Sequence, residues 1–523
     1  MGLQLALSGC AKEASCPRCD TLVIAATGEP SALLPPLVGE TVGRDVSDLI
    51  FERLAELPGG SSPLDSSAYL PRLASRWERV DSLTLRFHLR EGARWQDGTP
   101  VSAGDVLFSF AAYADSALEA QAYDVLAGRV AAAAPDDSTV LIRFREADPE
   151  QWYDATWHVR VLPRHLWDSI PVSRWSADTA SARVVGSGPY RLTEWVKGRS
   201  LTLERAGGGP APEIHRIVWR FVGEQDAALN LLLSHEADLL EAAGDSTRVA
   251  RVAADPELRA VPYPSAVYGF LGFNLASPPA GWRGREVRRA LAMALDRSAA
   301  ARGAVGSGTV APPGPMSRVL WIYDDSIAVA PHDSAGAAQL LDSAGWRRGA
   351  DGMRALGSRP LAIDILVPAT SVARRNLAQV IQEMWRRAGV KATVTSVDFP
   401  VFQERLRLGR FESFVGAWLD EPSPKGLGPQ WTAAGIGNLN YTRYRSPRFD
   451  SLFRRAAEFR GTPAAARRAW REALDTLNAE LPAIWLYTPT NVAAASSRIQ
   501  NLSIDPYSWL ATVRSWRLGK GDP

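Results

Sequence analysis

The sequence predicts an α/β protein of two or three lobes. At 523 residues the chain exceeds the size at which one hydrophobic core stops growing. Residues 361–397 read as strand, helix and strand, and such units build parallel sheets that helices cover. An amphipathic helix near the end passes into an apolar strand at Pro482, which indicates a late return to an earlier sheet. A large cleft between lobes is therefore expected.

The first elements are short and locally well specified. Residues 21–26 (TLVIAA) predict a buried strand, and residues 46–54 (VSDLIFERL) carry apolar side chains at helical spacing. After a linker rich in glycine, serine and proline, residues 83–110 predict a half-buried strand, an Asp-Gly turn and a helix. Ser102 and Asp105 have the spacing of a capping box at the start of that helix.

The middle of the chain continues this pattern of strands and helices. A glycine-rich turn around Ser187 leads into a predicted hairpin that ends near residue 206. Gly389 is placed to end the helix of the strand–helix–strand unit. Further strands are expected at 214–222 and 268–275, and further helices at 224–233 and 285–297.

Composition and motifs exclude several classes of function. A net charge of +2 with 22% charged residues gives no reason to expect binding to nucleic acid. No phosphate-binding loop, zinc-protease motif or nucleophile elbow occurs, and the six histidines are scattered without metal spacing. We therefore expect no catalysis, no metal and no cofactor.

All three cysteines lie in the first twenty residues. LALSGC resembles a bacterial lipobox, so residues 1–20 are expected to be a signal remnant and a tether lipidated at Cys10, and the alternative is a chance cysteine. The apolar run before Cys10 is short for a secretion signal, so we expect translation to start upstream. The pair Cys16 and Cys19 has the spacing of half a zinc site, but no second pair accompanies it. A disulfide, or two thiols without a role, is the better interpretation. No stretch reaches the roughly 18–20 apolar residues of a membrane span.

The clearest candidate for ligand contact lies in residues 414–431 (FVGAWLDEPSPKGLGPQW). A strand there ends in Trp418, followed by Asp420 and a loop rich in proline and glycine. An aromatic ring and an acid at a strand end suit a ligand with a cationic group. The alternative is that Asp420 caps a turn, and that most of the 18 tryptophans fill the core.

Several segments taken in order resemble bacterial extracellular solute-binding proteins of family 5, the dipeptide- and oligopeptide-binding components of ABC importers. The resemblance covers roughly residues 22–515. The segments that carry it are LPRLASRWERVDSLTLRFHLREGARWQDGTPVSAGDVLFSF, GSGPYRLTEW, FNLASPPAGWRGREVRRALAMALDR, AAQLLDSAGW, LAQVIQEMWRRAGVKATVTSVDFPVFQERLRLGRFE, YTRYRSPRFDSLFRRA and LPAIWLYTPTNV.

The resemblance implies a type II periplasmic-binding-protein-like fold, with two α/β lobes, a hinge, a cleft and an inserted third domain. Lobe I would comprise residues 21–65, 184–264 and 489–523. The inserted domain would comprise residues 66–183, and lobe II residues 265–488.

The family pattern also implies the contacts of the ligand. WLDEPSP matches the family segment in which an acid pairs with the α-amino group of a peptide, so Asp420 and Trp418 become candidates. The segment is one residue shorter than the family pattern, and Ser423 replaces its second acid. Candidate cleft contacts elsewhere are Tyr268, Gly269, Phe270 and Tyr113.

The function implied is that of an extracytoplasmic binding protein, in the periplasm or on the outer face of the cytoplasmic membrane. It would capture di- to oligopeptides and deliver them to ABC permease subunits, and we expect a monomer. The alternatives are another solute (a nickel chelate, haem, a sugar or an opine), a sensor or chaperone-like binder without transport, and an enzyme built on this fold.

Overall fold

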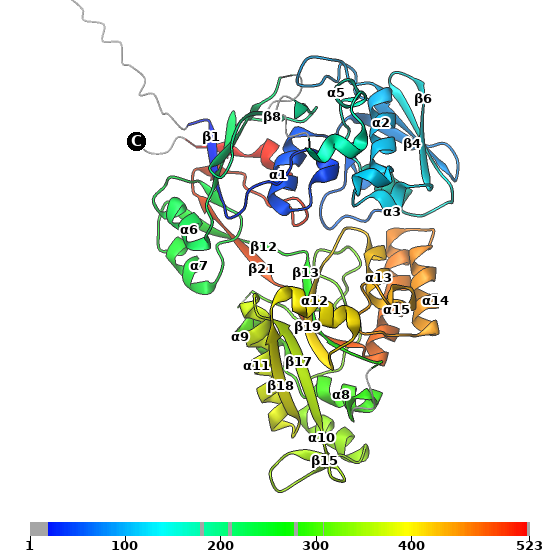
Figure 1. Ribbon diagram of the computed structural model, residues 1–523, viewed down its shortest axis with the longest axis vertical. Coiled ribbons are helices and arrows are strands. Elements are labelled where there is room, and N and C mark those ends of the chain that lie inside the picture. Colours follow the sequence, from blue (N-terminus) through cyan, green and yellow to red (C-terminus); the bar gives the residue numbers. More distant parts are fainter. Residues whose placement is uncertain (1–18, 178–182, 208–211, 277–280, 307, 520–523) are drawn as a thin grey trace, which may run out of the picture.

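The structure is a computed structural model, and it describes residues 19–177, 183–207, 212–276, 281–306 and 308–519. Cys10 and Cys16 lie outside these residues. Cys19 is disulfide-bonded. Figure 1 shows two bodies, one above the other. We call residues 19–264 with 490–519 the upper body, and residues 267–487 the lower body.

A seven-stranded sheet organises the left half of the upper body (Figure 1). Its order is β12 (Leu258–Pro264), β21 (Thr490–Ser496), β11 (Leu239–Leu240), β1 (Thr21–Ala26), β10 (Arg216–Phe221), β9 (Ser200–Arg205) and β8 (Tyr190–Val196). In β1, Leu22 and Ile24 join one apolar core while Val23 and Ala25 join another. Both faces are covered, which explains why the strand is apolar throughout.

A four-stranded sheet forms the right half of the upper body, in the order β4 (Ala74–Arg79), β5 (Thr84–Leu89), β7 (Thr139–Phe144) and β6 (Val130–Asp136). Its inner residues Leu85 and Phe87 belong to the same apolar core as Leu22 and Ile24. A separate inserted domain over residues 66–183 thus stays a prediction.

The helix after β5 begins as its sequence predicts. In α2 (Ala103–Tyr113) the Asp105 side chain accepts a hydrogen bond from the backbone N–H of Ser102 at 2.8 Å, and both halves of the capping box are present. The turn before α2 also joins the two upper sheets, because the Gln96 amide donates to the Tyr190 carbonyl at 2.7 Å.

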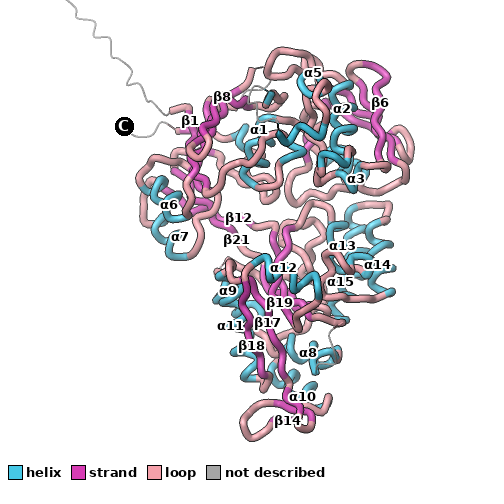
Figure 2. The backbone as a smooth tube through the Cα atoms, viewed as in Figure 1, coloured by secondary structure: helices cyan, strands magenta, loops and turns pink. Residues whose placement is uncertain are grey.

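A five-stranded sheet, seen as strands between helices in Figure 2, organises the lower body. Its order is β18 (Lys391–Val397), β17 (Ala362–Pro368), β19 (Ser413–Leu419), β13 (Val267–Phe273) and β20 (Ala483–Tyr487). The strands β17 and β18 are parallel and joined by α11 (Val372–Arg387), which confirms the predicted strand–helix–strand unit.

Helices cover both faces of this sheet, which therefore has two apolar cores. One face packs against α8 (Arg285–Met293), α9 (Arg297–Ala304), α10 (Ser334–Ser343) and α11. The other face packs against α12 (Phe399–Leu408), α13 (Leu427–Trp431), α14 (Pro447–Ala457) and α15 (Pro463–Glu480).

The chain passes between the two bodies at two neighbouring points. It descends from β12 to β13 through Ser265 and Ala266, and it returns from β20 to β21 through Thr488 and Pro489. The backbone N–H of Ser265 donates to the Pro489 carbonyl at 3.2 Å, so the two crossings lie side by side. Because β21 pairs with β11 and β12, the predicted late return to an earlier sheet is confirmed.

One predicted helix ends earlier than its apolar spacing indicates. Helix α1 runs over Thr41–Ile50, and Phe51 is already extended. The next residues instead pair with a distant segment, since the N–H groups of Leu73 and Ala74 donate to the carbonyls of Arg53 and Leu54. These long-range hydrogen bonds outweigh a helical periodicity that continues to Leu54.

The glycines beside Ser187 have a different role from the predicted tight turn. A Cβ atom on Gly186 would lie 1.8 Å from the Ile50 carbonyl oxygen, and one on Gly188 would lie 2.4 Å from that of Leu49. The N–H of Gly188 donates to the Ile50 carbonyl at 2.7 Å. These glycines therefore let the segment pack directly on the end of α1.

Candidate ligand cavity

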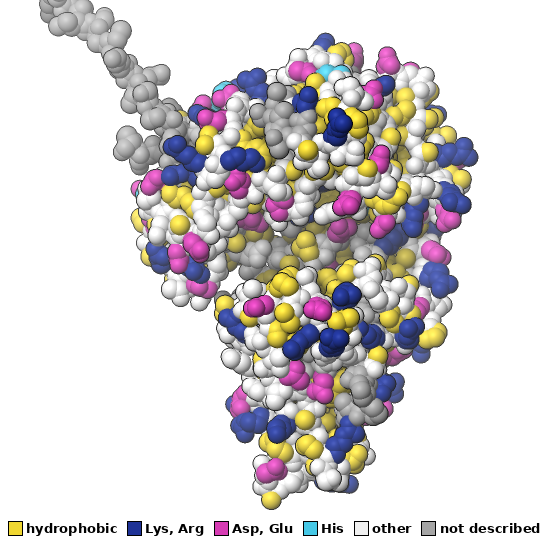
Figure 3. Space-filling view, in the orientation of Figure 1, with side chains coloured by type: hydrophobic (Ala, Val, Ile, Leu, Met, Phe, Trp, Pro, Cys, Tyr) yellow, Lys and Arg dark blue, Asp and Glu magenta, His cyan; other side chains and the backbone are white. Residues whose placement is uncertain are grey.

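The surface is hollowed between the two bodies (Figure 3). A cavity of about 170 Å³ lies in the upper body at this level, and Glu421 of the lower body completes its lining. The rest of the lining comes from three parts of the upper body: α1 and the residues flanking it, residues 113–160, and Tyr507 near the C-terminus. Because Glu421 belongs to the lower body and the other lining residues to the upper body, the shape of the cavity changes when the two bodies move relative to each other.

Helix α1 presents one polar face to the cavity. Arg44, Ser47 and Asp48 line it together, as residues three and four apart in a helix do. Asp48 accepts a hydrogen bond from Arg160 Nε at 2.7 Å and lies 3.6 Å from Arg53 Nη2. Burial by itself would raise the pKa of Asp48, but the two guanidinium groups outweigh it and lower that pKa. Asp48 is therefore ionised at neutral pH.

Aromatic rings form another wall of the cavity. Trp157 stacks on Tyr153 with ring centroids 5.5 Å apart, and Tyr507 meets it edge-on at 6.1 Å. The guanidinium carbon of Arg53 lies 4.9 Å from the Trp157 ring centroid, and Arg53 Nε donates to the Trp157 carbonyl at 3.0 Å. These contacts hold the indole in place beside the charged groups.

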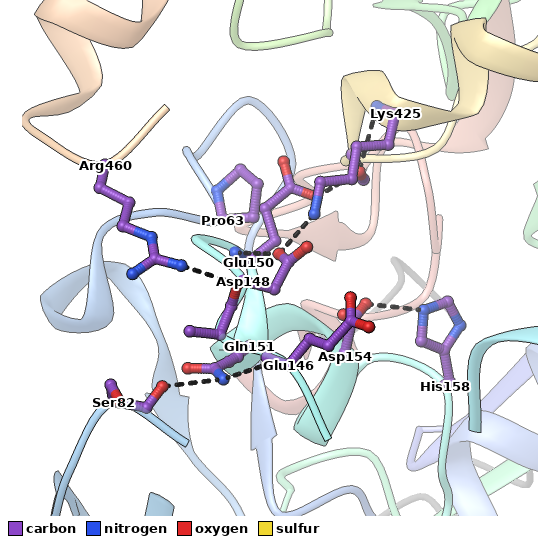
Figure 4. A network of polar contacts seen from close by, with 12 residues as sticks. Pro63, Ser82, Glu146, Asp148, Glu150, Gln151, Asp154, His158, Lys425 and Arg460 are labelled. Carbon is purple, nitrogen blue, oxygen red and sulfur yellow. Dashed lines mark hydrogen bonds and ion pairs between the residues drawn. The ribbon is translucent and has the colours of Figure 1, made fainter. Parts of the chain in front are cut away.

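A polar latch joins the two bodies, and Figure 4 shows Lys425 of the lower body beside Asp148 and Glu150 of the upper body. It consists of Asp148 and Glu150 from the upper body and Ser423 and Lys425 from the lower body. The Ser423 hydroxyl donates to Glu150 Oε2 at 2.5 Å, and the Lys425 ammonium bonds Asp148 and lies 3.7 Å from Glu150. Burial raises the pKa of Glu150 to about 7, although Lys425 and Ser423 act against this.

Asp420 follows β19 directly and lies beside the crossings. Its N–H donates to the Ala266 carbonyl at 2.7 Å, and its carboxylate accepts a hydrogen bond from the N–H of Ser317 at 2.5 Å. The side chain is 6% exposed, and burial raises its pKa to about 7 against the effect of Ser317. Asp420 directly precedes Glu421, which lines the cavity.

The other predicted contacts on β13 lie in the lower core. Tyr268 and Phe270 are 0% and 1% exposed and pack among the helices α12 to α15. The backbone of Gly269 pairs with Ala417 on one side and Tyr487 on the other. A Cβ atom on Gly269 would lie 2.0 Å from the Tyr487 ring, so the glycine makes room for that ring.

The remaining two candidates are in different surroundings. Trp418 is half-buried and stacks on Tyr441, with ring centroids 5.9 Å apart. Tyr113 lines the cavity, and its hydroxyl accepts a hydrogen bond from the N–H of Arg160 at 3.4 Å. Burial raises the pKa of Tyr113 to about 12, so its hydroxyl stays protonated. The structure thus brings Tyr113 and Asp420 to the cavity region.

The charged residues of the cavity were missed by sequence reasoning. They are Arg44, Asp48, Arg53, Arg160 and Glu421. The sequence does hold one indication of this charged group, the segment VRVLP. In it Arg160 lies between two valines that are buried. An unpaired charge is costly beside buried residues, so a partner for Arg160 was to be expected. Its partner Asp48 lies 112 residues earlier, so the pair could not be found from local pattern.

Across residues 19–519 apart from the undescribed gaps, no group of three or more histidine, cysteine, aspartate or glutamate side chains could hold a metal ion. None of the described helices combines the length and the apolar character that a membrane span needs.

Residues 68–438 match the family described as bacterial extracellular solute-binding proteins, family 5 Middle. The chain belongs to this family. The match covers well over half of the sequence and confirms the resemblance. Members of this family are periplasmic or extracellular solute-binding proteins.

Three similar proteins place the chain within that family. A putative ABC transporter peptide-binding protein of Brucella ovis is 26% identical, with 82% of this chain and 80% of the relative covered. The heme-binding protein A of Haemophilus influenzae is 23% identical, with 94% and 91% covered. The solved structure of the ABC transporter substrate-binding protein CtaP of Listeria monocytogenes has a TM-score of 0.82 at 20% identity, with 96% and 99% covered. The structural likeness confirms the type II fold.

Proposed function

We propose that the protein captures peptides of dipeptide to oligopeptide length between its two bodies and delivers them to an ABC permease. The observation that carries the proposal is the cavity itself, which is lined from both bodies and lies near the buried carboxyl group of Asp420. The peptide-binding name of the Brucella relative supports the same ligand class. The protein would act as a monomer outside the cytoplasm, tethered through lipidated Cys10.

Ligand binding would work through the relative position of the bodies. The crossings at residues 265–266 and 488–489 are the hinge, and the latch stabilises the closed arrangement. A peptide that contacts Glu421 and the upper wall together binds the closed form better than the open one, so it shifts the population toward closure. No bond of the ligand changes in this cycle.

Haem is the second candidate, because one relative is named a heme-binding protein. The name of the Brucella relative, a putative peptide-binding protein, favours a peptide. Mass spectrometry of material that co-purifies with the protein separates the two candidates. Peptides are expected, and a haem signal would overturn the proposal.

Asp420 would pair with the α-amino group of the peptide. Asp420→Asn is expected to weaken binding of peptides with free amino termini by about 2–5 kcal/mol, the cost of a desolvated charge that loses its partner. N-acetylated peptides should bind both proteins equally, as measured by calorimetry. Asp398→Asn is the matched control, because Asp398 is exposed and makes no side-chain cap bond at the start of α12. Equal losses for both peptide forms would remove this role.

The pH dependence offers a second readout of the same pairing. The pKa of Asp420 is about 7, so its carboxyl group takes up a proton as the pH falls below that value. A neutral carboxyl group no longer attracts an ammonium, and affinity should fall about tenfold for each pH unit below 7. The Asp420→Asn variant should lack this dependence.

A further inference from the structure

The ligand cavity adjoins a second hollow of the upper body, which we call the outer chamber. Its volume is about 520 Å³, and its lining comes from three short 3₁₀ helices and residues next to them. These helices are η1 (Pro35–Leu37), η3 (Ser116–Leu118) and η4 (Val172–Ala177). Four residues line both the ligand cavity and the outer chamber: Pro36, Val38, Gly39 and Gln121. A ligand held in the cavity can therefore extend a side chain past them.

The outer chamber is lined mostly by apolar side chains. Pro36, Leu37 and Val38 come from one segment of the chain, and Leu118 and Val172 come from two others. Contact with such a wall removes apolar surface of the ligand from water, which is favourable. The wall therefore suits a long aliphatic stem, and the charged end of a basic side chain can remain near solvent.

Charge differs between the two hollows. The charged residues of the ligand cavity are three arginines and two acids. The outer chamber is lined by one acid, Glu119, and none of the described residues that line it is basic. A cationic side chain of a ligand is therefore drawn toward the outer chamber.

Glu119 has an uncommon backbone conformation. It ends η3 with φ 51° and ψ 31°, in the left-handed region that residues other than glycine seldom adopt. Its neighbours Leu118 and Ala120 are buried, so they hold the backbone there. The Glu119 side chain is exposed, and within the described residues its carboxylate makes no hydrogen bond and no ion pair. Residues with strained backbones cluster at binding sites, so this free carboxylate indicates a contact with a ligand.

We propose that the outer chamber binds the basic side chain of a lysine or arginine residue in the captured peptide. This inference rests on the proposed peptide function and narrows its ligand class. The aliphatic stem of the side chain lies along the apolar wall, and its cationic end pairs with Glu119. The shared lining with the ligand cavity and the complementary charge favour this occupant over a wholly apolar side chain.

The test compares peptides that differ in one charge. Three alanine tripeptides carry lysine at the first, second or third position, and three matched peptides carry norleucine there, which keeps the four-carbon stem and lacks the ammonium. Calorimetry at low ionic strength measures each affinity. The natural protein is expected to prefer lysine at one position by about threefold to fivefold, the strength of an exposed ion pair. Salt at about 1 M should remove the preference, because it screens exposed charges.

Two variants of Glu119 separate binding from folding. Glu119→Gln should lose the preference for lysine and keep the affinity for norleucine peptides. Glu119→Gly should lose the same preference, while its thermal unfolding midpoint should equal or exceed that of the natural protein, because glycine adopts the left-handed conformation without strain. Glu91→Gln is the control, since Glu91 is exposed in the upper body and its side chain makes no hydrogen bond and no ion pair within the described residues. It should keep the preference.

A further variant tests the connection between the two hollows. A Cβ atom on Gly39, which lines both, would meet no other atom within 4 Å. Gly39→Leu therefore adds bulk at the junction where the structure has room for it. The variant should weaken binding of the preferred lysine peptide and leave the affinity for trialanine unchanged.

The contrary results are distinct. Equal affinity for lysine and norleucine at all three positions in the natural protein overturns this inference and leaves peptide binding standing. A preference that survives in both Glu119 variants, or in Gly39→Leu, places the cation elsewhere, and its loss in Glu91→Gln contradicts the assignment. If no tripeptide binds, the same comparison is made at each position of an alanine nonapeptide. Absence of binding at both lengths removes the peptide function, and this inference falls with it.

Discussion

The hydroxyl group of Tyr268 joins β13 to α13 inside the lower body. It donates to the Gln430 side chain and accepts a hydrogen bond from Trp431 Nε1 at 3.0 Å. The ring packs at 5.9 Å from Phe270 and 6.4 Å from Trp485. With every polar atom of its side chain paired inside the core, Tyr268 is built to position the loop after Asp420.

Tyr268→Phe should therefore lower stability and spare binding. The change leaves two buried polar groups without their partner, which costs about 1–3 kcal/mol of unfolding free energy. Denaturant unfolding measures the loss, and calorimetry should show peptide affinity within about twofold of the natural protein. Tyr441→Phe is the control, since the half-buried Tyr441 makes no side-chain hydrogen bond in the described chain. A loss of affinity at unchanged stability would instead make Tyr268 a ligand contact.

At the scale of elements, the latch connects the segment between β7 and α4 (Gln151–Thr156) to the loop after β19. Glu150 is 3% exposed and 273 residues from its partner Ser423. The Arg460 side chain adds a hydrogen bond to the Ala147 carbonyl at 2.9 Å. The segment before α4 thus contacts both the loop after β19 and the connection between α14 and α15.

Glu150 should make stability depend on pH. Burial raises the pKa of Glu150 from its ordinary 4.5 to about 7 in the folded protein. Between pH 4.5 and pH 7 the folded state therefore keeps a proton on Glu150 that the unfolded state has lost. The free energy of unfolding is therefore highest, as far as Glu150 is concerned, below about pH 4.5. It falls as the pH rises toward 7, by roughly 3 kcal/mol in total.

Glu150→Gln tests this dependence. The variant keeps the acceptor for Ser423 and should match the natural protein at pH 5 while being more stable at pH 8, as measured by urea unfolding at both values. The control is Glu146→Gln, because Glu146 is an exposed neighbour in the same segment. A variant whose stability falls between pH 5 and pH 8 as much as that of the natural protein would show that Glu150 is not the titrating group.

At the scale of the whole molecule, the two bodies meet at the crossings, at the latch and where Leu64 of the upper body packs on the lower core. The crossings lie beside β12 and β21, and the latch lies near α13 (Figure 1). Because the crossings are two short connections that lie side by side, rotation about them is the motion expected of the molecule. The latch residues then set how often the closed arrangement forms without a ligand.

Lys425→Gln should shift the molecule toward the open arrangement. The variant removes the ammonium that joins Asp148 and Glu150. Small-angle scattering should show a larger radius of gyration without peptide and a normal one with peptide. Apparent affinity should fall by up to about tenfold, because binding must first restore the closed fraction. Lys425→Arg is the control, and equal radii for the variant and the natural protein would remove the latch from closure.

Much of the fold could be predicted because it follows from short-range patterns. Three features depend only on residues within about forty positions of one another. They are the apolar run of β1, the capping box of Ser102 and Asp105, and the strand–helix–strand unit from β17 to β18. The end of α1 could not, since Leu73 and Ala74 decide where the helix stops. Of the site, Asp420 was indicated by the strand end before it and then by the family resemblance, Tyr113 was a predicted cleft contact, and the arginines of the cavity were not predicted.

The sequence by itself determined the family, the α/β class and the order of the main elements, because periodicity and turn chemistry act between residues that are close along the chain. Only the tertiary structure decided which charges meet. Asp48 and Arg160 are 112 residues apart, and Ser423 and Glu150 are 273 apart. The electrostatics of a buried group depend on the neighbours that packing brings to it, so the cavity and the latch exist only in the folded chain.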